Sequence, residues 1–131
     1  MAKLTIRVDF QNGASLGPGK IRLLEEIERT GSIRGAAESV DMSFRQAWLL
    51  LKAIEQMFEQ PVIEAQRGGS RGGGSALTDF GRIVIGAYRE VERAAAAAAS
   101  KEIAVLEKRL SPQIQNTGHR TIARKSLNTK G

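Results

Sequence analysis

The segment from Gly31 to Leu51 (GSIRGAAESVDMSFRQAWLLL) constrains the fold most, because it carries two helix-start signals separated by one short helix. Ser32 and Ser43 each precede a helix-competent run, and a serine in that position accepts a hydrogen bond from an unpaired backbone N–H group. Apolar residues follow each serine at helical spacing, namely Ile33, Ala36, Ala37 and Val40, then Ala47, Leu50, Ile54 and Met57. Asp41 and Met42 are left as the turn. The segment therefore predicts a helix-turn-helix.

The flanking elements are typical of a winged helix. Alternating apolar and polar residues predict a strand at 3–10, and a helix with proline in its first turn is expected at 18–30. Two further strands are expected at 62–66 and 76–78. Between them lies RGGSRGGGS, residues 67–75, whose glycines give it little intrinsic stiffness. A hairpin with a flexible, cationic tip is the wing of a winged helix.

Residues 79–110 predict one long helix, because they contain no proline and keep apolar residues three and four positions apart. Such a helix would be roughly 45 Å long, which is more than one small domain can cover. We therefore expect its apolar stripe to pair with a second copy of the chain. The expected dimerisation residues are Phe80, Val84, Ala87, Val91, Ala94 and Ala98. The alternative is a solvated, alanine-rich rod.

These elements predict a mainly α (α+β) fold with an N-terminal strand, a β-hairpin wing and a long C-terminal dimerisation helix. The expected domains are a winged helix at 1–78, the dimerisation helix at 79–110 and a basic tail at 111–131. Few apolar residues occur in the tail, so we expect it to be disordered.

Composition excludes several classes of protein. The chain of 131 residues has no cysteine, which excludes a disulfide framework and a thiolate metal site and is consistent with a cytoplasmic location. Its single histidine, His119, lies in the polar tail, and nothing pairs a nucleophile with a base, so we expect no enzyme activity. The formal net charge is +6, but the basic residues from Lys108 onward account for it. Net charge alone therefore does not identify the partner of the folded part.

The placement of individual cations points to double-stranded DNA. In a helix-turn-helix the first turn of the second helix enters the major groove, where Arg45 can pair with guanine and Gln46 with adenine. We expect Lys52 to contact phosphate, and Trp48 either to contact DNA or to seal the edge of the domain. A lone surface arginine is usually only solvated, but these cations share one predicted face. The expected DNA-binding residues are Ser32, Arg34, Ser43, Phe44, Arg45, Gln46, Trp48, Leu49, Lys52, Arg67 and Arg71, the last two on the wing.

Residues 1–110 resemble the N-terminal DNA-binding domain of ModE-type molybdate-responsive transcriptional regulators. The resemblance rests on GSIRGAAESVDMSFRQAW, on the glycine-rich wing RGGSRGGGSALT, and on the step Leu77-Thr78-x-x-Gly81 that opens the long helix. LysR-type regulators share the helix-turn-helix and that step, but their loop is generally less rich in glycine. The resemblance implies a homodimer that binds a two-fold operator, usually as a repressor, in genes of molybdate uptake or of molybdoenzymes.

Full-length members of that family carry C-terminal molybdate-binding modules, and residues 111–131 are too few to hold one. Molybdate is therefore expected, if at all, only on the strength of the resemblance, and no cofactor is expected with certainty. Two other functions remain open. The Arg-Gly segment could bind RNA or another single strand, although only Phe44 and Trp48 are available for stacking. The long helix could also serve an adaptor whose winged helix is inert.

Overall fold

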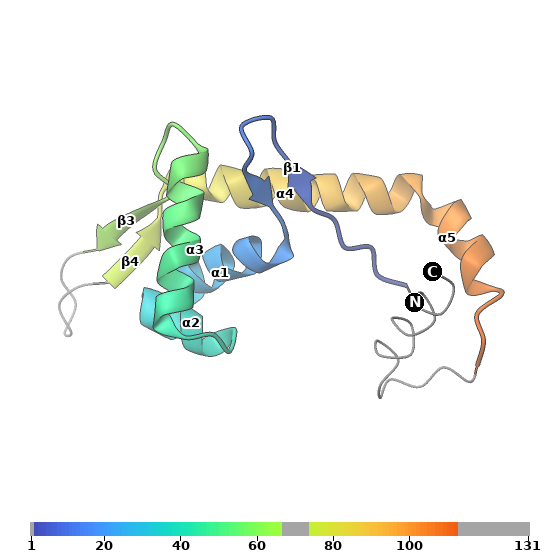
Figure 1. Ribbon diagram of the computed structural model, residues 1–131, viewed down its shortest axis with the longest axis horizontal. Helices are drawn as coiled ribbons and strands as arrows, with labels where there is room; N and C mark the ends of the chain where they lie inside the picture. Colours follow the sequence, from blue (N-terminus) through green and yellow to red (C-terminus); the bar gives the residue numbers. More distant parts are fainter. Residues whose placement is uncertain (1, 67–73, 113–131) are drawn as a thin grey trace, which may run out of the picture. The chain divides into compact units, whose positions relative to one another are not determined.

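The computed structural model describes residues 2–66 and 74–112, and it has the mainly α (α+β) architecture expected. The elements, in chain order, are β1 (Val8–Asp9), β2 (Ser15–Leu16), α1 (Pro18–Thr30), α2 (Ile33–Ser39), α3 (Phe44–Met57), β3 (Ile63–Gln66), β4 (Gly74–Leu77), α4 (Asp79–Ala98) and α5 (Ser100–Glu107). Residues 3–98 form one compact unit, and α5 belongs to a second. Figure 1 shows α1, α2 and α3 on one side of α4, with the β3–β4 hairpin where α4 begins.

Helix α1 is the centre of the core. Four of its residues, Ile21, Leu23, Leu24 and Ile27, have no exposed surface. They pack with α2, α3, β4 and α4, and the small side chains of α2 and α3 at this point let the three helices approach closely. Buried residues from these neighbours are Ala36, Ala37, Ala47, Leu51, Ile54, Leu77, Val84 and Tyr88, and Val62, just before β3, is buried with them. Helix α4 therefore begins as part of the winged-helix core.

Both predicted N-caps of the helix-turn-helix are confirmed. The hydroxyl of Ser32 accepts a 2.8 Å hydrogen bond from the backbone N–H of Gly35. The hydroxyl of Ser43 accepts a 3.0 Å bond from the backbone N–H of Gln46, and the Gln46 side-chain oxygen accepts a 3.1 Å bond from the backbone N–H of Ser43. This reciprocal pair is a capping box, which fixes where α3 starts.

The turn between these helices places Asp41 in the left-handed region, with φ of 59°. It is the only non-glycine residue with positive φ among residues 2–66 and 74–112. A side chain with a Cβ pays a steric cost there that glycine avoids, and aspartate tolerates it better than most residues.

We therefore expect Asp41→Ala to lower the free energy of unfolding by about 1 kcal/mol. Alanine keeps the Cβ that makes the left-handed conformation costly, and it lacks the short polar side chain with which aspartate can form a local hydrogen bond there. Asp41→Gly should leave stability unchanged or raise it slightly. Urea unfolding followed by circular dichroism measures both variants. Equal stabilities for the two variants would contradict the left-handed assignment.

Two sequence expectations need correction. The strand expected at residues 3–10 is reduced to Val8–Asp9, because its partner in the described chain, β2, is only two residues long. The single helix expected over 79–110 is divided, since α4 ends at Ala98 and α5 begins at Ser100, with ψ of 5° at Ala99. Past Ala95 the side chains of α4 are exposed up to its end, so no packing opposes a local distortion there.

Among the described helices, none combines the length and apolarity needed to cross a membrane.

Candidate nucleic-acid interface

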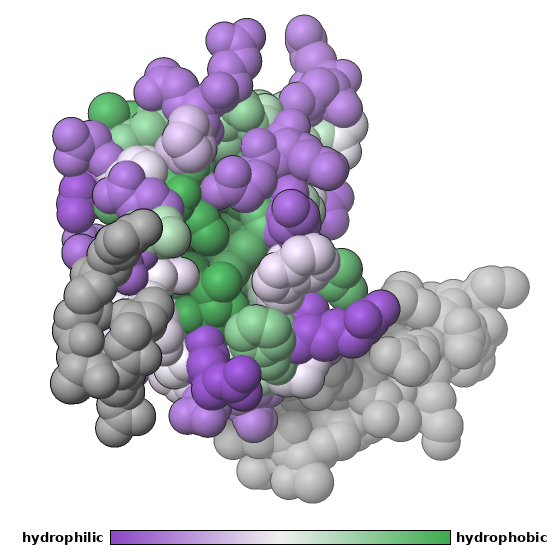
Figure 2. Space-filling view, turned by 90° about the vertical axis from the view of Figure 1, so that its left-hand side faces the viewer, coloured by the Kyte–Doolittle hydropathy of each residue, from purple (hydrophilic) through white to green (hydrophobic). Residues whose placement is uncertain are grey.

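Helix α3 has one buried and one exposed face. Ala47, Leu51 and Ile54 are directed into the core. The residues expected to contact DNA occupy the outer surface, where all of Ser43, Phe44, Arg45, Gln46, Trp48, Leu49 and Lys52 are exposed. Figure 2 shows the side of the molecule that carries the hairpin, where hydrophobic residues gather in the middle among hydrophilic ones. The helix-turn-helix therefore presents its predicted recognition residues to solvent.

The cations of α2 and α3 have no acidic partner. Arg34, Arg45 and Lys52 form no salt bridge with any residue of the described chain. Their positive charge is therefore available to an external anion.

The three arginines of α4 behave differently, because each of them pairs with a carboxylate of the described chain. Arg89 lies 2.8 Å from Glu25 and 2.7 Å from Glu92, and hydrogen bonds to these carboxylates raise its pKa well above the ordinary value. Arg82 lies 2.9 Å from Glu28 of α1. Ion pairing thus separates arginines that brace α4 against α1 from cations that face outward on α2 and α3.

Two of the outward cations lie over aromatic rings. The guanidinium carbon of Arg34 is 5.0 Å from the ring centroid of Phe44, and the ammonium of Lys52 is 5.2 Å from that of Trp48. Such contacts orient a cation without neutralising it. The contact between Arg34 and Phe44 also joins α2 to the first turn of α3, so Arg34 and Arg45 belong to one continuous surface.

Gln46 has a structural role that the sequence analysis did not assign to it. Its side-chain oxygen is engaged by Ser43 in the capping box. A bidentate pair with adenine needs both the oxygen and the amide N–H₂ of glutamine. That pair would require the capping box to open, whereas the N–H₂ group can donate to a base as it stands.

The root of the hairpin is anchored beside α2. The backbone N–H of Ser75 in β4 donates a 2.9 Å hydrogen bond to the carbonyl oxygen of Gly31, the residue that caps α1 with φ of 83°. Gly74 is so close that a Cβ there would lie 2.9 Å from the same oxygen. Arg67 and Arg71 lie outside the described residues. The start of β4 lies next to Ser32, because Ser75 is hydrogen-bonded to Gly31, and it is therefore close to the first residues of α2.

The exposed apolar stripe of α4 differs from the expected one at its N-terminal end. Val84 is 5 % exposed and belongs to the chain's own core, so it is not free for dimerisation. Phe80 is half-buried, with its ring 5.3 Å from that of Phe58. The remaining expected residues, Ala87, Val91, Ala94 and Ala98, are exposed. Ile83, which the sequence analysis missed, is 62 % exposed. Its place three residues after Phe80 and four before Ala87 made it as good a candidate for the stripe as Val84, and spacing alone does not distinguish the two.

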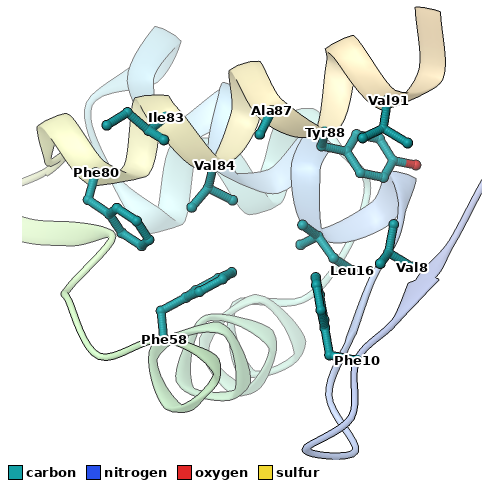
Figure 3. A pocket seen from close by; sticks show the side chains of 10 residues that line it. All are labelled: Val8, Phe10, Leu16, Phe58, Phe80, Ile83, Val84, Ala87, Tyr88 and Val91. Atoms are coloured by element: carbon teal, nitrogen blue, oxygen red, sulfur yellow. The ribbon is translucent and has the colours of Figure 1, made fainter. Parts of the chain in front are cut away.

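An apolar groove of about 310 Å³ runs beside this stripe. Its walls come from α4, from the β1–β2 hairpin and from the end of α3, and the lining residues are Val8, Phe10, Leu16, Phe58, Phe80, Ile83, Val84, Ala87, Tyr88 and Val91. In Figure 3, Phe10 and Phe58 point toward α4, and Phe80 and Val84 point back toward them. Tyr88 closes one end, and its hydroxyl donates a 2.6 Å hydrogen bond to the carbonyl oxygen of Ile6.

Within residues 2–66 and 74–112, no group of three or more acidic, histidine or cysteine side chains is arranged to hold a metal ion.

The sequence of this chain is similar to those of known regulators. Residues 19–82 match the family described as "Bacterial regulatory helix-turn-helix protein, lysR family". The chain is 38 % identical over 92 residues to the molybdenum transport protein ModE of Azotobacter vinelandii, which covers 70 % of this chain and 33 % of that protein. It is 31 % identical over 87 residues to the DNA-binding transcriptional dual regulator ModE of Escherichia coli (strain K12), which covers 66 % of this chain and 33 % of that protein. A solved structure of a mutant of S. aureus MepR is similar with a TM-score of 0.48 and 15 % identity, covering 88 % of this chain and 80 % of that one.

The chain thus spans about a third of the length of the curated relatives it matches. The matched part contains the helix-turn-helix, the hairpin and the start of α4. The matched family consists of regulators, in agreement with the expectation that the chain is not an enzyme. The chain contains a ModE-like winged-helix DNA-binding domain, with a helix-turn-helix of the LysR type.

Proposed function

We propose that this chain is a sequence-specific transcriptional regulator that acts in the cytoplasm as a homodimer on a two-fold operator. The observation that carries the proposal is the set of outward cations on α2 and α3, Arg34, Arg45 and Lys52, which no carboxylate of the described chain neutralises. Uncompensated cations on a helix-turn-helix are suited to the phosphates of duplex DNA.

The outward cations, Ser32 and the wing then have separate roles in the complex with DNA. Helix α3 enters the major groove, with Arg45 at a guanine edge and Lys52 at a phosphate. Ser32 and Arg34, at the start of α2, contact the phosphates that pass there. Arg67 and Arg71 of the wing reach the neighbouring minor groove, since β4 rejoins the chain next to Ser32.

Dimerisation through α4 is supported by the apolar groove and by the exposed stripe beside it. Ile83 and Val91 are 62 % and 46 % exposed on a helix whose opposite side carries paired arginines. A continuous apolar surface of this kind on a small domain favours association with a partner. Two copies joined by this surface would present their α3 helices to the two halves of a symmetrical operator.

The names of the relatives suggest which genes are involved. One is named a molybdenum transport protein, and the Escherichia coli relative is named a dual regulator. We therefore propose that this chain represses genes of molybdenum uptake or of molybdenum-dependent enzymes. Molybdate is the effector to test first, by calorimetry with molybdate and tungstate in the presence and absence of operator DNA.

Two substitutions on α3 test the proposed contacts. Arg45→Ala should reduce discrimination between the operator and unrelated duplexes by about 10- to 100-fold, because a bidentate contact to guanine contributes about 1–3 kcal/mol. Lys52→Ala should weaken binding to all duplexes alike and lower the slope of log K against log salt by about 1. Fluorescence anisotropy at several salt concentrations measures both effects.

Arg93→Ala is the matched control, because Arg93 is paired with Glu90 at 2.6 Å on exposed α4 and has no role in the proposed interface. It should bind DNA like the unsubstituted chain. If Arg45→Ala discriminates between the operator and unrelated duplexes as well as the unsubstituted chain does, the groove assignment is wrong. A chain that prefers single-stranded RNA would support the Arg-Gly loop as the binding site, and one that binds no nucleic acid would support the adaptor.

A further inference from the structure

The outer surface of α3 is unusually apolar for a helix that faces solvent. Phe44, Trp48 and Leu49 are 43 %, 43 % and 48 % exposed, although all three lie within two turns. The aromatic contacts of Phe44 and Trp48 within the described chain are the two cation–π pairs with Arg34 and Lys52, which leave the rings at the surface. Three large apolar side chains grouped this closely indicate a surface that becomes buried on binding.

The cations around these residues identify what covers them. Arg34 lies over Phe44, and Lys52 lies over Trp48, so the apolar side chains sit between positive charges. A protein partner with an apolar surface would leave these cations unpaired, whereas duplex DNA supplies phosphates on both sides of the major groove. Charge complementarity therefore selects DNA as the occupant, in agreement with the proposed function on which this inference rests.

Within the major groove only one group is apolar. Thymine presents a C5-methyl group, whereas the other exposed base edges are mainly hydrogen-bond donors and acceptors. An apolar side chain that covered such a polar edge would remove its water without replacing the lost hydrogen bond. The side chains on α3 are thus matched to thymine and mismatched to the polar edges of the other bases.

We propose that Phe44 and Leu49 read thymine methyl groups, and that each operator half-site carries thymine beside the base contacted by Arg45. Leu49 follows Arg45 by four residues, one helical turn or about 6 Å along α3, so the two share one line on the exposed face. Phe44 directly precedes Arg45 at the first residue of the helix. The operator is therefore specified by apolar contacts in addition to hydrogen bonds.

The test replaces thymine by uracil, which lacks only the methyl group. A duplex that binds the full-length chain is first selected from a random pool, and each thymine is then replaced singly by deoxyuridine. We expect affinity to fall about fourfold at each contacted position, the loss that corresponds to one buried methyl group. Symmetrical replacement in both half-sites should lower affinity more than tenfold.

Variants assign the contact to a residue. In Leu49→Ala, one of the sensitive positions should bind thymine and uracil equally, while the others keep their preference. Leu106→Ala is the matched control, because Leu106 is 67 % exposed on α5, which is not part of the helix-turn-helix. It should preserve the full preference for thymine. Circular dichroism and thermal unfolding verify that both variants are folded.

The outcomes separate this inference from the proposed function. If the chain binds its selected duplex but no deoxyuridine replacement lowers affinity, methyl reading is wrong and the DNA-binding function stands. If no duplex is selected at all, both are overturned. If sensitive positions exist but Leu49→Ala changes none of them, the assignment of methyl reading to Leu49 is overturned.

Discussion

Replacing Gly81 by alanine is expected to lower the free energy of unfolding by about 3 kcal/mol. A Cβ at this position would overlap the carbonyl oxygen of Val62 and would lie 3.2 Å from its carbonyl carbon. Neither the carbonyl group of Val62 nor the backbone of Gly81 can move away easily, because both are held by hydrogen bonds. The Val62 oxygen accepts a 3.0 Å hydrogen bond from the backbone N–H of Thr78, and the hydroxyl of Thr78 accepts a 2.9 Å bond from the backbone N–H of Gly81.

Gly86→Ala provides the control, because it makes the same change on the same helix. Nothing lies within 4 Å of a Cβ built at Gly86, so alanine there should raise stability by about 0.5–1 kcal/mol through its higher helix propensity. Urea unfolding of both variants measures the difference. If Gly81→Ala were as stable as the unsubstituted chain, α4 could not start against Val62 as described.

The same contact gives a physical reason for the step Leu77-Thr78-x-x-Gly81. Leu77 is buried, Thr78 both caps α4 and donates a hydrogen bond from its hydroxyl to the carbonyl of Pro61, and Gly81 allows the helix to touch the strand. The three residues thus fasten α4 to the hairpin. This explains how one short motif can fix the direction in which the long helix leaves the domain.

Features set by local interactions could be predicted from the sequence. The caps at Ser32 and Ser43 and the turn between the two helices depend on residues within four positions of one another, so their spacing was sufficient. Helix α1 likewise begins at Pro18 and ends at Thr30 as expected, because proline and glycine mark its two ends. The exposed surface of α3 followed from the same periodicity.

Features set by distant residues could not be predicted in this way. The sequence does not reveal that Arg82 and Arg89 find carboxylates on α1, more than fifty positions away, while Arg34 and Arg45 find none in the described chain. Helical spacing also could not decide that Val84 faces the core and Ile83 faces outward, because both fit a three- to four-residue repeat. The division of the long helix at Ala99 had no sequence signal, since alanine favours helix.

Ile83→Lys is expected to convert a dimer into a monomer at micromolar concentration. Ile83 is 62 % exposed and borders the apolar groove, so lysine there leaves the core of the single chain intact. In the proposed dimer each copy would bury one Ile83 side chain. Losing two such side chains costs about 4 kcal/mol, which corresponds to a nearly thousandfold higher dissociation constant. Sedimentation equilibrium measures the change directly.

The control places the same charge on the opposite side of the same helix. Ala96 is exposed and lies across α4 from the stripe of Ile83, Ala87 and Val91, so Ala96→Lys should leave the dimer intact. The two variants should also differ on DNA. Ile83→Lys should lose affinity for a two-fold operator and keep its affinity for a single half-site, because linking two half-sites requires a joined pair of α3 helices. An unsubstituted chain that sediments as a monomer would rule out α4 as a dimer interface, and a monomer that still bound the two-fold operator tightly would show that symmetry is not needed for recognition.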